Sequence, residues 1–232
     1  MMIFRQLFER ESSTYTYLLG CENTRQAVLI DTVKSEVDRY LQLLQELDLT
    51  LAYVLDTHTH ADHITGAGDL RNLTGAKTLL GEEAHSACVS QSLHHGAVIK
   101  VGQLSITALH TPGHTDDSYC FVVDNNGQHY VFTGDTLLIR GTGRTDFQNG
   151  SAADQYASLF EKLLTLPANT WVYPGHDYKG WTVSTLAEEK AHNPRLQVND
   201  VAEYEALMNN LKLPNPKMMD IAVPANRACG KE

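Results

Sequence analysis

The sequence predicts an α/β protein in which two β-sheets pack together and helices cover their outer faces. Short apolar segments typical of buried strands occur in both halves of the 232-residue chain, and helical patterns punctuate them. Packing two sheets face to face, with helices outside, buries the apolar faces of all these elements, which favours an α/β sandwich. Several strands end directly in His or Asp, so this fold would hold chemically useful side chains on loops fixed by a rigid scaffold.

The first half of the chain begins with β-structure and then alternates helices with strands. The predicted elements are strands within 3–19, a strand at 27–31, a helix at 34–47, a strand at 52–55, a helix from Asp62 to near Gly75, and a strand at 78–80. In the first helix, Val37, Leu41 and Leu44 recur with the spacing of one amphipathic face. The segment 27–31 is a short apolar run that ends in an acid, which is typical of a buried strand leading into a loop.

The second half starts with more strands and ends with helices. The predicted elements are alternating β-structure at 98–110, a hairpin of 119–123 with 130–132, a helix at 151–166, a strand at 171–173, helices around 183–191 and 200–211, and a Pro-rich tail through Pro214, Pro216 and Pro224. The turn Asn125-Asn126-Gly127 is a strong hairpin signal. Ser151 is suited to cap the N-terminus of the helix that follows it.

We expect a single domain over 1–232, because no linker or low-complexity segment interrupts the chain. Its core would cover about 1–178, and a C-terminal helical extension and tail would cover about 179–232. With 42% hydrophobic and 20% charged residues, the chain is too apolar for intrinsic disorder. A domain of this size buries enough surface to fold without disulfides or a structural metal.

Charge, cysteine content and hydropathy exclude several classes of protein. The formal net charge of −10 argues against nucleic acid or an anionic membrane as a partner. The four cysteines are spread along the chain without a CxxC pair, which predicts four reduced thiols: Cys21, Cys88, Cys120 and Cys229. The N-terminus turns polar too early for a signal peptide, and no apolar run approaches the roughly 20 residues of a membrane span. We therefore predict a cytoplasmic protein.

Histidine and aspartate residues concentrate at predicted strand ends. His58, His60, Asp62 and His63 form the pattern HxHxDH directly after the strand at 52–55. Three further segments carry single candidates at other strand ends: Thr111-Pro112-Gly113-His114-Thr115, Phe132-Thr133-Gly134-Asp135-Thr136 and Tyr173-Pro174-Gly175-His176-Asp177. Imidazole and carboxylate are ligands for Zn and Fe, so these segments together indicate metal binding. They supply enough ligands for two sites, and Asp135 could bridge both.

Taken in this order, HxHxDH, TPGHT, FTGDTL and YPGHD resemble the metallo-β-lactamase superfamily over about residues 1–178. The segment 137–148, with Ile139-Arg140-Gly141-Thr142-Gly143-Arg144-Thr145-Asp146-Phe147, is similar to the persulfide dioxygenases, the family of the human ethylmalonic encephalopathy protein. Asn193-Pro194-Arg195-Leu196 and Ala222-Val223-Pro224-Ala225-Asn226 extend this resemblance to nearly the whole chain. It implies an αβ/βα sandwich of two mixed sheets flanked by helices.

The resemblance also implies a metal, a substrate and a reaction. One Fe(II) per subunit would be held by His58, His114 and Asp135, with Zn as an adventitious or alternative metal. His60, Asp62, His63 and His176 would orient the ligands and water, or hold a second metal. The enzyme would oxidise glutathione persulfide with O₂ to sulfite and glutathione, as a homodimer, with persulfide supplied by a separate rhodanese-type sulfurtransferase.

Arg140 and Arg144 flank a Gly-Thr-Gly loop just after Asp135, where their guanidinium groups could bind the carboxylates of glutathione. Tyr178 could close the same pocket. Asp146 could instead pair with one of the two arginines.

Two other functions compete with this interpretation. A glyoxalase II-type hydrolase would use the same seven His and Asp positions to hold two metals and would hydrolyse a glutathione thioester. The segment at 139–147 and the short C-terminal region argue against it, and a lactonase or another superfamily hydrolase is a more distant alternative. A non-catalytic metal-binding or sulfur-carrier module would hold metal but turn over no sulfur substrate.

Overall fold

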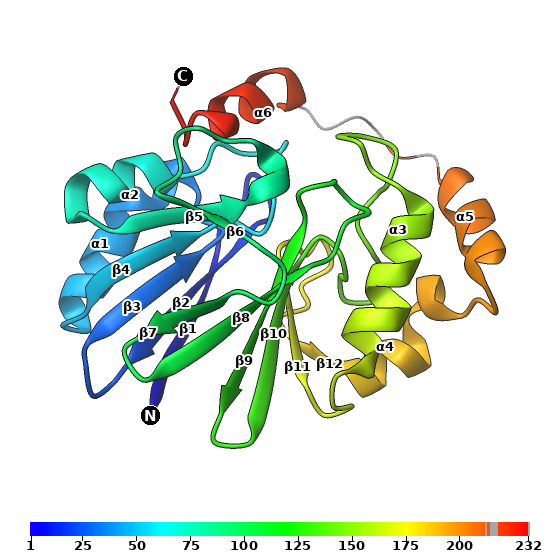
Figure 1. Ribbon diagram of the computed structural model, residues 1–232, viewed down its shortest axis with the longest axis horizontal. Helices are drawn as coiled ribbons and strands as arrows, with labels where there is room; N and C mark the ends of the chain where they lie inside the picture. Colours follow the sequence, from blue (N-terminus) through cyan, green and yellow to red (C-terminus); the bar gives the residue numbers. More distant parts are fainter. Residues whose placement is uncertain (212, 214–217, 232) are drawn as a thin grey trace.

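Two six-stranded sheets form the centre of the molecule (Figure 1). The computed structural model describes residues 1–211, 213 and 218–231. The first sheet has the order β1 (Met2–Phe8), β2 (Tyr15–Cys21), β3 (Gln26–Ile30), β4 (Thr50–Leu55), β5 (Lys77–Gly81) and β6 (Gln91–Leu93). The second has the order β12 (Ser184–Thr185), β11 (Trp171–Pro174), β10 (Gln128–Gly134), β9 (Tyr119–Asn125), β8 (Leu104–His110) and β7 (Val98–Val101). Each sheet combines parallel with antiparallel pairs, so the predicted pair of mixed sheets is confirmed.

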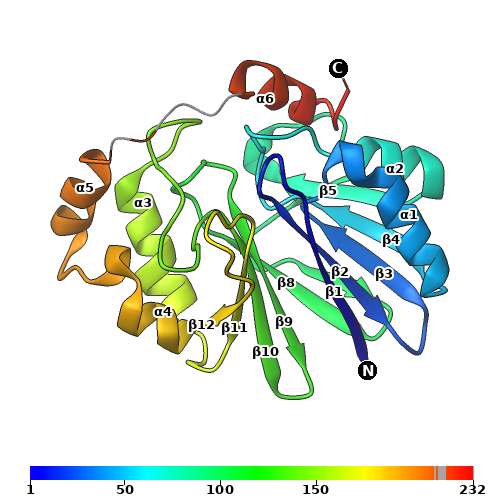
Figure 2. The same cartoon turned by 180° about the vertical axis from the view of Figure 1, so that it is seen from behind.

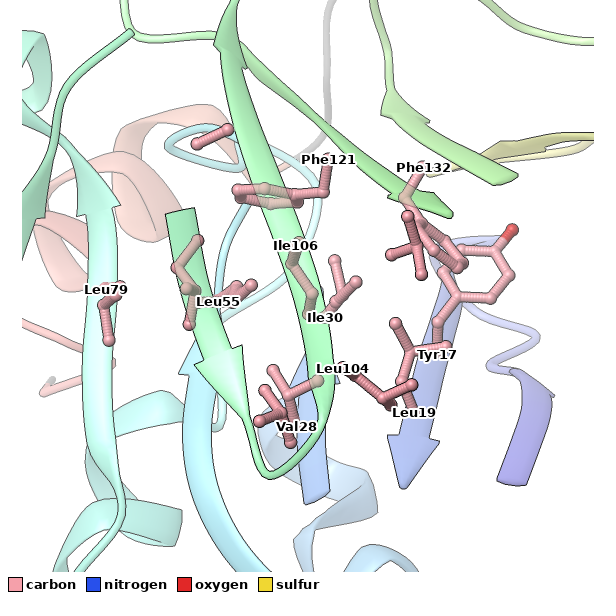
Figure 3. Packing of buried hydrophobic residues seen from close by; sticks show 14 of the residues in the cluster. Tyr17, Leu19, Val28, Ile30, Leu55, Leu79, Leu104, Ile106, Phe121 and Phe132 are labelled. Atoms are coloured by element: carbon pink, nitrogen blue, oxygen red, sulfur yellow. The ribbon is translucent and has the colours of Figure 1, made fainter. Parts of the chain in front are cut away.

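The main apolar core lies between the two sheets (Figure 3). Alternate residues of β2 and β3, among them Tyr17 and Ile30, point toward Ile106, Phe121 and Phe132 of the second sheet. All five of these side chains are buried. Because side chains alternate between the faces of a strand, the neighbouring residues point to the outer faces, where helices cover them.

Helices complete an αβ/βα arrangement of layers (Figures 1 and 2). The first sheet is covered by α1 (Val37–Glu46) and α2 (Ala67–Thr74), which share a second core with it. The second sheet is covered by α3 (Ala152–Ala157), α4 (Leu186–His192) and α5 (Val201–Asn209), which enclose a third core. Within the described residues, no helix combines the length and apolar character needed to cross a membrane.

The predicted helix from Asp62 is wrong in its first turn, because α2 begins only at Ala67. Other elements take up the backbone groups of the preceding loop. The amide of Lys34 donates to the carbonyl of Ile64 at 2.8 Å, and the amide of Gly66 donates to the carbonyl of Thr32 at 3.0 Å. The loop therefore stays extended and irregular, and the helix ends as predicted at Gly75, which adopts φ 78°.

Two local predictions from the second half are confirmed. The amide of Asp154 donates to the Ser151 hydroxyl at 3.2 Å, which makes Ser151 the cap of α3. The predicted helix continues through a wider turn at Ser158–Lys162 and a tighter one at Leu163–Thr165. In the hairpin of β9 and β10, Asn126 and Gly127 both have positive φ, as the favoured two-residue turn requires.

The C-terminal tail departs from the prediction. A helix, α6 (Met219–Arg227), forms there although Pro224 lies inside it, because Ala222, Ala225 and Asn226 are buried against the first half of the chain. Pro214 and Pro216 lie outside the described residues. The prediction of four reduced thiols is also wrong, because Cys88 and Cys229 form a disulfide. Spacing gave no sign of this pair, whose members are 141 residues apart.

Candidate metal centre

The predicted His and Asp residues follow strands that end at a common edge of their sheets. In the first sheet, the parallel strands β3 and β4 lead into Asp31 and into the loop that carries His58. In the second sheet, β8, β10 and β11 run in the same direction and lead into His114, Asp135 and His176. Side chains from both sheets meet there and form two adjacent clusters.

The first cluster consists of His58, His114 and Asp135, whose potential ligand atoms all lie within 4.8 Å of one another. Nε2 of His114 and Oδ2 of Asp135 are 3.6 Å apart. His58 is buried, whereas the side chains of His114 and Asp135 keep 13% and 12% of their surface exposed. The cluster is thus held from the protein side and open to small molecules on the other.

Hydrogen bonds fix the protonation state of His58. The Thr57 hydroxyl donates to Oδ2 of Asp31 at 3.0 Å, so its oxygen can only accept from Nδ1 of His58, 2.9 Å away. The proton therefore sits on Nδ1, and Nε2 keeps its lone pair. Burial, together with the nearby His60 and His114, holds the pKa of His58 well below its ordinary value, so the ring is neutral.

His114 is oriented in the same way by the main chain. Its Nδ1 lies 2.7 Å from the carbonyl oxygen of Arg144, which can only accept a hydrogen bond. Nδ1 of His114 therefore donates, and Nε2 is the nitrogen that faces Asp135 and is left to bind a metal. A metal-binding His normally donates its other nitrogen to a carbonyl or another acceptor, and both His58 and His114 meet that requirement without any rearrangement.

Asp135 completes the cluster as an anion. Burial alone would raise the pKa of its carboxyl group, but the neighbouring His176 lowers it well below the ordinary value. Gly143 packs directly against this pair of ligands. A Cβ added to Gly143 would lie 2.3 Å from the carbonyl oxygen of Asp135 and 2.7 Å from Nδ1 of His114, so no other residue fits there. The donor set of two imidazoles and one carboxylate fits a divalent transition metal.

The second cluster, His60, Asp62, His63 and His176, has the same types of ligand but is joined by hydrogen bonds. Nδ1 of His176 lies 2.7 Å from Asp135 and its Nε2 lies 2.8 Å from Asp62. Both partners are ionised carboxylates, so both ring nitrogens donate. Burial alone would lower the pKa of His176, but Asp135 and Asp62 raise it well above its ordinary value. His176 is therefore a cation in this arrangement.

Two ring nitrogens of the second cluster make no hydrogen bond to any described residue. Nε2 of His60 donates to Asp31 at 3.1 Å, and Nδ1 of His63 donates to Asp62 at 2.9 Å. Their other nitrogens, Nδ1 of His60 and Nε2 of His63, are buried without a hydrogen-bond partner among the described residues. Such atoms call for a water molecule or a cation.

A third group consists of Asp31, Asp56 and His60, which lie next to these clusters. Burial alone would lower the pKa of His60, but Asp31 raises it to about 9. Burial raises the pKa of Asp56 to about 6, and its carboxylate accepts from the Thr65 hydroxyl at 2.9 Å. All of these side chains bond to one another or to the loop, which gives the group a structural role.

The predicted substrate-binding residues lie around the centre in different roles. Tyr178 stacks on His176, with ring centroids 6.1 Å apart, and lines a cavity of ≈ 670 Å³ together with Asp62 and His63. Arg144 forms a two-point ion pair with Asp146, at 2.6 and 2.8 Å. This is the pairing that the sequence offered as the alternative for one of the arginines. The guanidinium group of Arg140 bonds instead to the buried carboxylate of Glu189.

The sequence did not identify Asp31, Thr57 or Asn226 as residues that organise the site. Asp31 carried a signal, since it ends a predicted strand, but its partner Thr57 carried none. Asn226 was also missed, although its side chain bonds to the loop between His60 and Thr65. It lies in a stretch that contributed to the resemblance but has no metal-ligand chemistry of its own.

Comparisons with known proteins agree with this geometry. The model of the metallo-beta-lactamase superfamily matches residues 10–176. The chain is 48% identical to the mitochondrial persulfide dioxygenase ETHE1 of Mus musculus over 229 residues, which cover 99% of this chain and 89% of the relative. It is 37% identical to a probable hydroxyacylglutathione hydrolase of Schizosaccharomyces pombe, covering 84% and 74%. The crystal structure of ETHE1 from Myxococcus xanthus superposes with a TM-score of 0.95 at 58% identity, covering 99% of this chain and all of that one.

Proposed function

The chain belongs to the metallo-β-lactamase superfamily and, within it, to the persulfide dioxygenase family, and from this premise we propose that it oxidises glutathione persulfide with O₂ at a single ferrous iron. The overall reaction consumes glutathione persulfide, O₂ and water, and yields glutathione, sulfite and two protons. The observation that carries the proposal is the first cluster, in which two imidazoles and one carboxylate are already oriented as ligands.

We propose His58, His114 and Asp135 as the iron ligands. Two His and one carboxylate are the ligand set of non-haem iron oxygenases, and three protein ligands leave positions open for substrate and O₂. Bound ferrous iron would supply the redox chemistry that joins persulfide sulfur to oxygen. Zn(II) fits the same donors, so the metal found in a purified sample depends on its supply.

The remaining residues orient the ligands and bind the substrate. His176, as a cation between Asp135 and Asp62, fixes Oδ1 of Asp135 and leaves Oδ2 directed at His114. Arg144 contacts the centre through its carbonyl, and its guanidinium group would bind a carboxylate of glutathione with Asp146 holding it in place. Tyr178 would form a wall of the pocket beside His176. For Arg140, which pairs with Glu189, a contact with substrate remains a prediction.

Substrate delivery, assembly and location are further proposals. We propose that a separate sulfurtransferase supplies the substrate as a persulfide. We propose that the protein is cytoplasmic. We also propose that it is a homodimer, and size-exclusion chromatography with light scattering would test this oligomeric state.

A second candidate function has one observation in its favour. Nε2 of His63, which has no hydrogen-bond partner among the described residues, could bind a second metal, and Nδ1 of His60 could join it once that ring loses its proton, as a glyoxalase II-type hydrolase of glutathione thioesters requires. The hydrolase relatives match a smaller part of the chain at lower identity, so we favour the dioxygenase.

The test is to load the protein anaerobically with Fe(II), add glutathione persulfide, and record O₂ uptake and sulfite together. We expect equal amounts of O₂ consumed and sulfite formed, and negligible hydrolysis of S-lactoylglutathione. Thioester hydrolysis without O₂ uptake, in protein with verified iron, would replace this proposal with the second candidate.

A further inference from the structure

Near the end of the C-terminal helix α6, Asn226 bonds directly to the loop that carries the proposed iron ligand His58. The side-chain nitrogen of Asn226 donates to the carbonyls of His60, at 2.9 Å, and His63, at 2.8 Å. Its side-chain oxygen accepts from the amide of Thr65 at 2.8 Å. Asn226 is buried, and both ends of its amide are used. A single side chain from the far end of the sequence thus fixes three backbone groups of this loop.

The backbone after Asn226 packs tightly on the same region. A Cβ added to Gly68 would lie 2.2 Å from the carbonyl oxygen of Cys229, and one added to Gly230 would lie 2.2 Å from the carbonyl oxygen of Thr65. The side chain of Lys34 donates to the carbonyl of Gly230 at 2.9 Å. These contacts pack the segment after Asn226 closely on Thr65 and Gly68, so a displacement of Cys229 would displace Asn226 with it.

A disulfide fastens this segment from the other side. Cys229, three residues beyond Asn226, is bonded to Cys88 in the loop between β5 and β6, with the two Cα atoms 5.9 Å apart. The Ser86 hydroxyl also donates to the carbonyl of Arg227 at 2.9 Å. Cys229 is buried, whereas Cys88 is only partly buried, so Cys88 is the more accessible of the two residues.

We propose that Asn226 is a positioning residue for the metal-binding loop and that the Cys88–Cys229 disulfide holds it in place, so that thiols weaken metal retention. This deepens the proposed function, because the loop in question carries His58. A thiolate attacks Sγ of Cys88, breaks the sulfur–sulfur bond and forms a mixed disulfide, and a second thiol then displaces Cys88. Two thiols lose two electrons and become one external disulfide, while Cys88 and Cys229 each gain a proton.

Glutathione, the product of the proposed reaction, is a thiol of the required class. In a reducing compartment such a bond is transient, as in proteins that sense the thiol pool. Reduction frees α6 to move, the loop then loses the hydrogen bonds of Asn226, and His58 is held less firmly. Because residues that support metal ligands contribute about 10–100-fold to metal affinity, we expect an effect of about tenfold.

The experiment compares Fe(II) affinity, measured by anaerobic competition with a chromophoric chelator, in oxidised and reduced protein. The reduced sample is treated with a phosphine that is removed before iron is added, and mass spectrometry verifies the state of the two cysteines. We expect the dissociation constant of Fe(II) to rise about tenfold on reduction. Equal affinities in the two states would overturn the proposal.

Four variants separate the effect of the Cys88–Cys229 disulfide, which we call the latch, from the effect of Asn226. Cys88→Ser should bind Fe(II) as weakly as the reduced protein, and treatment with the phosphine should not change its affinity. Cys21→Ser, which removes a buried free thiol, should lose Fe(II) affinity on reduction as the parent protein does. Asn226→Ala should bind weakly in both states, and Asn226→Asp, which keeps only the acceptor for Thr65, should do the same. If Asn226→Ala fails to fold by circular dichroism, Asn226→Asp and Cys88→Ser decide the question. Strong iron binding in a folded Asn226 variant would contradict the proposal.

The iron affinities are measured without substrate, so they test the latch proposal separately from the proposed enzymatic function. Protein that makes sulfite but binds iron equally in both states overturns only the latch. Protein that shows redox-dependent iron binding but makes no sulfite overturns only the dioxygenase.

Discussion

The two clusters at the edge of the sheets contain the same kinds of side chain but differ in how their protons are arranged. In the first cluster, Nδ1 of His58 donates a hydrogen bond to Thr57, and Nδ1 of His114 donates one to the carbonyl of Arg144. Both Nε2 atoms are therefore left to bind a metal. In the second, His176 directs both of its protons at Asp62 and Asp135. Ligand identity therefore does not determine how many metals such a site holds, whereas the direction of the hydrogen bonds bears on it directly.

Replacing the one anionic ligand of the first cluster should have the largest effect. Asp135→Ala leaves only His58 and His114, which would hold Fe(II) weakly, and it also removes one of the two carboxylate partners of His176. We expect the protein to retain less than about one tenth of its iron and sulfite formation to fall at least about 100-fold. Iron analysis after desalting, beside Asp124→Ala at an exposed site, measures this. Full iron occupancy would remove Asp135 from the ligand set.

A smaller but diagnostic effect is expected from the residue that orients His58. Thr57→Val keeps the shape of the side chain but removes the acceptor for Nδ1 of His58, so Fe(II) affinity should fall by about 10–100-fold. Thr170→Val is the matched control, because the buried hydroxyl of Thr170 has no hydrogen-bond partner among the described residues. Equal affinities in both variants would show that the tautomer of His58 is fixed by something else.

Arg144 tests the approach of substrate rather than the metal. Arg144→Ala should raise KM for glutathione persulfide about tenfold, the low end for a charged hydrogen bond because Asp146 already engages the guanidinium group. Iron content should stay unchanged, and Arg39→Ala, on the outer helix α1, should have no effect on KM. Steady-state kinetics with verified iron give both values. An unchanged KM would exclude Arg144 from substrate binding.

The smallest effect on metal content is expected in the second cluster. His63→Asn removes a ring whose Nδ1 donates to Asp62 and whose Nε2 makes no hydrogen bond within the described part of the chain, yet it leaves the first cluster untouched. Iron should remain at one per chain, with an affinity changed less than about threefold, against the 10–100-fold expected when a ligand's support is lost. Loss of a metal equivalent in this variant would identify His63 as a ligand.

The sequence predicted the sandwich and the seven His and Asp positions, because strand ends and ligand patterns are local features. It failed where distant segments decide the structure. The loop 62–66 resembled a helix start, but Lys34, Thr32 and Asn226 occupy its backbone groups. Pro224 indicated an irregular tail, and the burial of Ala222 and Ala225 overrides that preference. The Cys88–Cys229 pair depends on α6 docking, which no spacing between cysteines encodes.

Anomalous scattering at the iron edge, from crystals grown anaerobically with excess Fe(II), tests most directly whether the first cluster binds iron and the second does not. We expect one strong peak, within bonding distance of Nε2 of His58, Nε2 of His114 and Oδ2 of Asp135. A second peak of similar height between His60, His63 and His176 would contradict it, because the second cluster would then bind metal as readily as the first.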